Sequence, residues 1–320
     1  MPPKVSVITP VYNRVTWLRE SLESALDQTY PEVEIVLIDD GSDTKEAEQI
    51  AASYSNIRYH WQPNQGSGSA RNKGITLCSG EFLLFLDDDD WLTQGAVAEK
   101  MDYMQQDPGI GIVYSDLLLV DGNNSIIGRY FAHRRQPPPS GDLYFELLPS
   151  NFIPPASMLW RRSVVEEAGG FPDWSGAEDW FLLIRAAERT RFKYVDKVHG
   201  GYRIHDTNMT RIIGQQTKGY TKVQEAVINS GHFVALPSRS QAKVFSHYAV
   251  LQMMSGDPAL ARAYLKRARK IAPTYLTPLV LSIAATLGQT TFRSLIKTFR
   301  RIRYLLRPIP SSTSIFLGYD

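Results

Sequence analysis

The sequence predicts an α/β fold, with a mostly parallel sheet covered by helices on both faces and a helical extension at its C-terminal end. In residues 1–120, short continuous apolar runs alternate with segments whose apolar residues recur at helical spacing. Continuous apolar strands are typical of a parallel sheet that is buried on both faces. From about residue 215 onward the pattern is helical. We therefore expect an α/β domain over residues 1–214 and a basic helical extension over residues 215–320.

Five segments, four of them apolar runs, predict the strands of this sheet. The first run is followed by Pro10, the second stops at Asp39, and the fourth leads directly into an aspartate cluster. Ligands of such sheets bind beyond the carboxyl ends of the strands, so polar residues at these ends indicate a candidate site. The predicted strands are residues 5–8, 34–38, 57–61, 82–86 and 110–114.

Apolar residues at helical spacing predict the helices between these strands. Leu18, Leu22, Ala25 and Leu26 show this spacing in the first helix. After residue 120 the pattern becomes irregular, and the Pro-rich segment 134–141 predicts a loop. The predicted helices of the α/β domain are residues 15–28, 44–54, 69–78, 92–106, 164–168 and 177–188.

The composition is that of an ordinary globular protein, with 43% hydrophobic and 21% charged residues. The single cysteine, Cys78, excludes an intramolecular disulfide and is typical of a reducing compartment. No long apolar run follows the first residues, as it would in a signal peptide. We therefore expect a cytoplasmic protein, with the inner face of the membrane as a peripheral location.

Charge is distributed unevenly along the chain. Residues 258–320 hold eleven Lys and Arg side chains and one acidic side chain, Asp320, whereas the preceding 257 residues hold 24 basic and 32 acidic side chains. Residues 291–306 combine an apolar stripe with five cations, which suits an anionic membrane surface. Packing of this helix on the first domain explains the pattern equally well. No aromatic platform or reader motif indicates a nucleic-acid partner.

Four consecutive aspartates, Asp87 to Asp90, follow the fourth predicted strand. Alternate side chains of extended backbone share a face, so Asp87 and Asp89 are expected on one face and Asp88 and Asp90 on the other. Two carboxylates on one face suit Mg²⁺ or Mn²⁺, which take oxygen ligands and bridge phosphate oxygens. The alternative is a solvated acidic turn that caps the next helix through Asp90.

Three further polar clusters accompany the aspartates. Asp39 and Asp40 can accept hydrogen bonds from a base or a ribose, or can simply form a turn before a helix. The Gly/Ser loop 64–72 carries Arg71 and precedes a helix, whose free N–H groups and dipole attract phosphate. Asp179 lies at the start of another helix, where it is either a general base or a favourable N-terminal charge.

Together these segments resemble the family 2 glycosyltransferases, which have the GT-A fold. The resemblance covers roughly residues 4–211. Its segments are VSVITPVYNR at 5–14, IDDGS at 38–42, NQGSGSARNKG at 64–74, the aspartates at 87–90, EDW at 178–180 and YRIH at 202–205. The departure is Asp88, where this family usually has a small residue, although the D-x-D spacing is kept.

The resemblance implies a role for each matching residue. The donor-binding residues that it implies are Pro10, Tyr12, Asp39, Asp40, Arg71, Asp87 and Asp88. The metal ligands that it implies are Asp87, Asp89 and His205, and the catalytic base is Asp179. For His205, a purely structural role is an equal alternative.

The implied reaction is a single displacement that moves a sugar, with inversion, from a nucleoside-diphosphate sugar to an acceptor hydroxyl. A UDP-sugar is the expected donor, and Mn²⁺ or Mg²⁺ would stabilise the departing diphosphate. A glycan or lipid-linked acceptor, in polysaccharide or glycolipid assembly, is the expected partner. Two other classes stay open: a nucleotidyltransferase, which would release pyrophosphate, and an inactive scaffold that binds nucleotide sugars.

Overall fold

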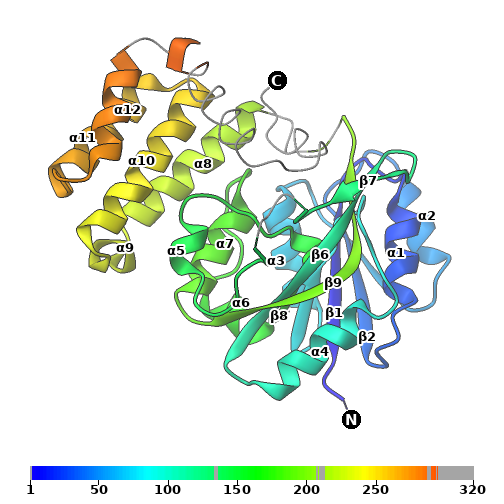
Figure 1. Cartoon of the computed structure of the whole chain (residues 1–320). Helices are drawn as coiled ribbons and strands as arrows, with labels where there is room; N and C mark the ends of the chain where they lie inside the picture. Colours follow the sequence, from blue (N-terminus) through cyan, green and yellow to red (C-terminus); the bar gives the residue numbers. More distant parts are fainter. Residues whose placement is uncertain are drawn as a thin grey trace. The chain divides into compact units, whose positions relative to one another are not determined.

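The computed structural model describes residues 2–132, 136–206, 208, 213–286, 290–292 and 294 (Figure 1). The chain divides into two compact units, Met1–Asn208 and Met209–Asp320. The domain boundary expected after residue 214 stays a prediction.

The first unit is built on a mixed sheet. Among the described residues, its strands lie in the order β3-β2-β1-β4-β8-β6-β9-β5, with β7 beside β6. The first four strands along the chain are parallel, β6 is parallel to β9, and β8 lies antiparallel between β4 and β6. The strands are β1 (Val5–Val11), β2 (Val33–Asp39), β3 (Ile57–Trp61), β4 (Phe82–Phe85), β5 (Trp91–Leu92), β6 (Ile110–Asp121), β7 (Ile126–Arg129), β8 (Met158–Arg161) and β9 (Arg191–Ile204).

Helices cover both faces of this sheet, as the continuous apolar strands predict (Figure 1). On one face, Val7 of β1 belongs to a core cluster with Leu22 of α1 and Val97 of α4. On the other face, Gly74 of α3 lies so close to Ile8 that a Cβ would overlap the isoleucine side chain. The helices of this unit are α1 (Leu18–Leu26), α2 (Glu46–Ala52), α3 (Ser67–Leu77), α4 (Ala96–Gln106), α5 (Tyr144–Leu147), α6 (Arg162–Glu167), α7 (Glu178–Ala187) and the 3₁₀ turn Pro155–Ser157.

The structure differs from the sequence-based expectation around β5 and β9. The helix expected from residue 92 begins at Ala96, because Trp91 and Leu92 pair with Gly201 and Gly200 of β9. A Cβ on Gly200 would overlap the Trp91 backbone, and one on Gly201 would overlap the Trp91 indole. The 14-residue strand β9 falls in the region whose pattern is irregular in sequence. Of the expected loop 134–141, residues 134 and 135 lie outside the described residues.

The second unit is helical in its described residues, which confirms the expected helical extension. Its helices are α8 (Ile213–Ile228), α9 (Gly231–Ala235), α10 (Ser238–Ser255), α11 (Pro258–Ile271) and α12 (Leu276–Thr286). Gly256, with a φ of 109°, ends α10, and the Asp257 side chain caps α11 by accepting a hydrogen bond from the Leu260 N–H at 2.8 Å. No helix in the described ranges is long and apolar enough to cross a membrane. Most of the basic stripe expected over 291–306 lies outside these ranges.

Candidate functional site

Parallel pairing brings three polar strand ends to one edge of the sheet. Val11 of β1 is in register with Asp39 of β2, and the Asp40 N–H donates to the Val11 carbonyl at 2.8 Å. One strand farther on, the Leu86 N–H donates to the Ile8 carbonyl at 3.0 Å, just before the aspartate run. The segments that the sequence analysis singled out therefore lie at this edge together.

The aspartate run forms an acidic cluster. Asp87, Asp89 and Asp90 each place one carboxylate oxygen within 4.8 Å of the other two. The expectation that Asp90 points away with Asp88 was wrong, because the chain turns here. The Asp90 N–H donates to the Asp87 carbonyl at 3.1 Å, so the alternation of an extended strand ends at Asp87.

Asp90 is the most deeply buried carboxylate of the acidic cluster. Its Oδ1 accepts a hydrogen bond from the Arg203 N–H at 3.0 Å, whereas its Oδ2 is buried without a hydrogen-bond partner in the described residues. Burial, with the charges of Asp89 and Asp87, raises the pKa of Asp90 well above its usual value. A hard divalent cation fits this donor set, since it takes carboxylate oxygens and relieves their repulsion.

Two side chains from distant parts of the chain contact the cluster. Arg14, just after β1, pairs with Asp89 at 2.9 Å and also with Asp88. His205, just after β9, lies with its Nε2 2.8 Å from the Asp89 Oδ2. Burial raises the pKa of Asp88 to about 7, although the Arg14 charge opposes this shift. The extra carboxylate at position 88 is therefore engaged with Arg14 and is not part of the acidic cluster.

Arg203 holds the segment that carries His205. Its buried guanidinium donates to the Asp89 carbonyl at 2.9 Å and pairs with Glu20 at 2.7 Å. It also lies over the Trp17 ring, which in turn packs against the His205 ring with 4.5 Å between centroids. These contacts join β9 to the turn that carries the aspartates.

Arg71 connects the acidic cluster to α7. Its Nη2 lies 2.6 Å from the Asp87 carboxylate, and its Nη1 lies 3.4 Å from that of Glu178. The guanidinium also stacks over the Phe171 ring, 5.4 Å from its centroid. Arg71 is buried, so a permanent cation lies between the carboxylate of Asp87, which follows β4, and that of Glu178 in α7. The site expected around Asp87 and the one around Asp179 are therefore contiguous.

Asp179 lies in the first turn of α7. Its Oδ1 accepts a hydrogen bond from the Trp180 N–H, and its Oδ2 accepts one from the Asn151 amide, both at 2.8 Å. Burial raises the pKa of Asp179 to about 6, and Glu178 adds to this shift while Arg71 opposes it. Such a carboxyl group is ionised at neutral pH yet more basic than a solvated aspartate, as a general base requires.

Further residues of the candidate site lie at the carboxyl ends of β1 and β2. Asp39 accepts hydrogen bonds from the Ser42 N–H at 2.8 Å and the Tyr59 hydroxyl at 2.9 Å. Tyr12 exposes half of its surface here, whereas Pro10 is buried in β1. An exposed aromatic ring beside buried carboxylates is a suitable platform for a nucleobase.

Asp40 holds the loop before α3. Its Oδ1 accepts from the Gln62 amide at 2.7 Å, and its Oδ2 accepts from the Gly66 N–H at 2.8 Å. Gly66 has a φ of 90°, which glycine adopts without strain. The structure thus places Asp40 inside the loop's own hydrogen-bond network, beneath the edge that carries Tyr12.

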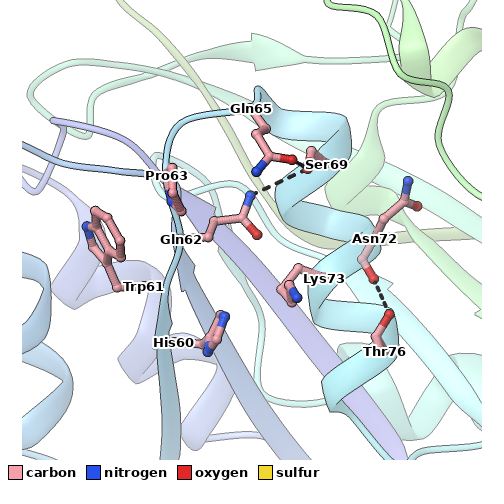
Figure 2. Close-up of a pocket in the computed structure, with 9 residues that line it drawn as sticks. All are labelled: His60, Trp61, Gln62, Pro63, Gln65, Ser69, Asn72, Lys73 and Thr76. Atoms are coloured by element: carbon pink, nitrogen blue, oxygen red, sulfur yellow. Dashed lines mark hydrogen bonds between the residues drawn. The ribbon is translucent and has the colours of Figure 1, made fainter.

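A groove of about 420 Å³ lies between β3 and α3 (Figure 2). Gln62 lies at its centre and joins it to Asp40, while the indole of Trp61 and the ammonium of Lys73 border it. No carboxylate lines this groove, so it lies apart from the acidic cluster and Asp179.

Sequence reasoning missed Arg14, Asn151 and the contact of Asp90 with the cluster. Arg14 belongs to the matched segment 5–14, but its partner Asp88 is 74 residues away. Asn151 reaches Asp179 from a segment with no regular pattern. No local signal in the sequence identifies either contact.

Comparison with known proteins indicates the family of the chain. Residues 6–169, half of the chain, match the family described as Glycosyl transferase family 2. An uncharacterized glycosyltransferase of Rickettsia felis is 35% identical over 194 residues, which are 58% of this chain and 32% of that protein. The chain thus spans about a third of the length of that relative.

Two solved structures have a similar fold. Staphylococcus aureus TarS 1–349 in complex with UDP-GlcNAc has a TM-score of 0.67 at 17% identity, covering 93% of this chain and 92% of that one. The mannosyltransferase PcManGT of Pyrobaculum calidifontis, in complex with GDP-Man and Mn²⁺, has a TM-score of 0.60 at 18% identity, covering 100% and 84%. The expected GT-A type fold is confirmed. The chain belongs to glycosyl transferase family 2.

Proposed function

We propose that the protein transfers a sugar, with inversion, from a nucleoside-diphosphate sugar to a hydroxyl of a glycan or lipid-linked acceptor. The observation that carries this proposal is the position of Arg71 between Asp87 and Glu178, the neighbour of Asp179. It supports the proposal that the acidic cluster, as a cation site, and Asp179, as a base, act in one site. A polysaccharide or a glycolipid is the acceptor class we propose.

Asp87 and Asp89 are the proposed ligands of Mn²⁺ or Mg²⁺, with His205 as a third. The unpartnered Oδ2 of Asp90 and the carboxylate donor set support a hard cation. When bound, this cation supplies positive charge to the diphosphate that leaves. His205 contacts the Asp89 oxygen directly, so it either ligates the cation or orients that carboxylate.

The donor is proposed to be a UDP-sugar, as in the TarS complex. Its nucleoside would lie on the exposed Tyr12 ring, next to Pro10, Asp39 and Asp40. Arg71 and Asp88 would act through their neighbours: Arg71 holds Asp87, and Asp88 holds Arg14. The Gln62 and Gly66 contacts of Asp40 shape the loop around this nucleoside.

Asp179 is the proposed catalytic base. Its Oδ2, oriented by the Asn151 amide, would take the proton of the acceptor hydroxyl as that oxygen attacks the anomeric carbon. Buried Arg71 nearby stabilises the ionised form of Asp179 that this step needs. A nucleotidyltransferase has no need of this base, and an inactive scaffold has no reason to keep it beside the acidic cluster.

A thermal-shift screen of nucleoside diphosphates and their sugars, with and without Mn²⁺, tests the proposal. We expect UDP and a UDP-sugar to raise the melting temperature, and Mn²⁺ to increase this shift. Incubation of the best donor with candidate acceptors should then release a nucleoside diphosphate. Release of pyrophosphate would identify a nucleotidyltransferase instead, and tight donor binding without turnover of any donor would identify a scaffold.

We also propose a cytoplasmic location, with peripheral binding to the inner face of the membrane. The basic residues after Pro258 support this proposal through their attraction to anionic lipid.

A further inference from the structure

Helix α12 presents an apolar face to solvent. Leu276, Val280 and Ile283 expose 67%, 62% and 60% of their surface, and Leu279 exposes 38%. These positions follow the i, i+3, i+4, i+7 spacing of one helix face, while Pro278 and Ala285 are buried on the opposite side. Single exposed apolar residues are ordinary, but a contiguous apolar face indicates an interaction surface.

A cationic groove borders this apolar face. It lies between α11 and α12, has a volume of about 620 Å³, and has Leu279 in its wall. Its α11 wall carries Arg262, Lys266, Arg269 and Lys270. Helix α11 buries Ala261, Leu265 and Ala268 against the rest of the second unit, so these cations project from its exposed side.

The four cations of this groove have no ion-pair partner among the described residues. Residues 258–286 contain no Asp or Glu. No ion pair with Arg262, Lys266, Arg269 or Lys270 occurs within the described part of the chain. The surface therefore has net positive charge directly beside exposed aliphatic side chains.

The combination of cations and exposed aliphatic side chains distinguishes among the possible binding partners of this surface. A second copy of the chain would place like charges against each other across this surface, which is unfavourable. A polyanionic glycan would pair with the cations but would leave Leu276, Val280 and Ile283 in water. An anionic bilayer satisfies both parts, because its phosphates meet the cations while its acyl boundary takes the aliphatic side chains.

We propose that α11 and α12 form an interfacial binding surface for an anionic membrane. The apolar face of α12 inserts at the boundary between headgroups and acyl chains, and the α11 cations bind lipid phosphates. Every residue of this surface belongs to the second unit, whereas the residues of the proposed transferase site belong to the first.

Flotation of the full chain with lipid vesicles tests this proposal. We expect binding to vesicles of phosphatidylcholine with phosphatidylglycerol, and little binding to phosphatidylcholine alone. Val280→Ser and Lys266→Glu should each weaken binding about fivefold or more. The matched controls are Val234→Ser on α9, where the valine exposes 64% of its surface, and Lys218→Glu on the exposed side of α8. Both controls should bind like the unmodified chain.

Equal loss of binding in the controls and in the α11 and α12 variants would overturn the proposal. So would unchanged binding of Val280→Ser together with a change from dimer to monomer in light scattering, because the face would then join two copies. A third contrary outcome is unchanged binding with a lower melting temperature for Val280→Ser, which would show that this face is covered within the protein. Donor-dependent thermal shifts should be unaltered in all four variants, which separates this surface from the proposed reaction.

Discussion

The raised pKa of Asp179 predicts how the rate of the proposed reaction depends on pH. A carboxyl group with a pKa of about 6 is ionised at pH 7.5 and protonated at pH 5. We expect the rate of transfer to rise with pH through about 6 and then to level off, because only ionised Asp179 accepts the proton. The pH dependence of kcat, measured with saturating donor and Mn²⁺, checks this expectation. A flat profile between pH 5 and 8 would exclude Asp179 as the titrating base.

Replacement of Asp179 by Asn keeps the size and the contact with Trp180 but removes the base. We expect Asp179→Asn to lower kcat by about 10²–10⁴-fold and to leave donor binding, measured by calorimetry with Mn²⁺, almost unchanged. Asp173→Asn, at an exposed position outside the site, is the matched control. Near-normal transfer by Asp179→Asn would show that another group takes the proton.

At the scale of the elements, α4 carries a lysine with no exposed surface. The Lys100 ammonium has one hydrogen-bond partner within the described residues, the Ala96 carbonyl at 3.5 Å. Burial lowers the pKa of Lys100 from 10.5 to about 7, so the unfolded chain binds more protons than the folded chain between these values. The free energy of unfolding should therefore rise with pH across this window.

Lys100→Met removes this buried amine and keeps most of its volume. We expect the variant to be more stable at pH 7 by about 1–3 kcal/mol and to lose the rise in stability between pH 7 and 10. Urea denaturation at several pH values measures both effects. Lys45→Met, at a lysine whose side chain is 83% exposed, should change neither.

The elements that the sequence predicts well are those whose formation depends on the residues of the element itself. Strands β1, β2 and β4 follow apolar runs whose residues are mostly buried, and helix α11 begins at an Asp-Pro pair whose aspartate caps it. Strand β9 is different, because Lys193, Asp196 and Lys197 interrupt its apolar pattern. Strand β5 has two residues, and its existence depends on pairing with glycines more than 100 positions later.

In the acidic cluster, too, some features follow from the local sequence and others depend on the tertiary fold. The aspartates follow β4 in the sequence, so their position at the sheet edge was predictable. The inclusion of Asp90 in the cluster was not predictable. It depends on a turn between Asp87 and Asp90, and a run of four identical residues contains no signal for such a turn. The pairing of Arg14 with Asp88 and Asp89 depends on the tertiary fold alone.

At the scale of the whole molecule, the division into two units separates the proposed reaction from the proposed membrane surface. The acidic cluster, Arg71, His205 and Asp179 all belong to residues 1–208, which have their own core. We expect a fragment of residues 1–214 to fold and to bind UDP with Mn²⁺ within about threefold of the affinity of the full chain, as measured by calorimetry. A folded fragment that shows no UDP binding would mean that the second unit completes the donor site.

The pairing of Trp91 and Leu92 with Gly201 and Gly200 has a further consequence for the proposed donor site. Trp91 directly follows the acidic cluster, and Arg203 and His205 follow the two glycines after one and three residues. The absence of a Cβ at Gly200 lets the two backbones approach closely, and its absence at Gly201 leaves room for the Trp91 indole. This spacing sets how far His205 reaches toward Asp89. A methyl group added at Gly200 would push the two chains apart at one end and would thereby alter the affinity of the proposed metal site from a position that touches none of its proposed ligands.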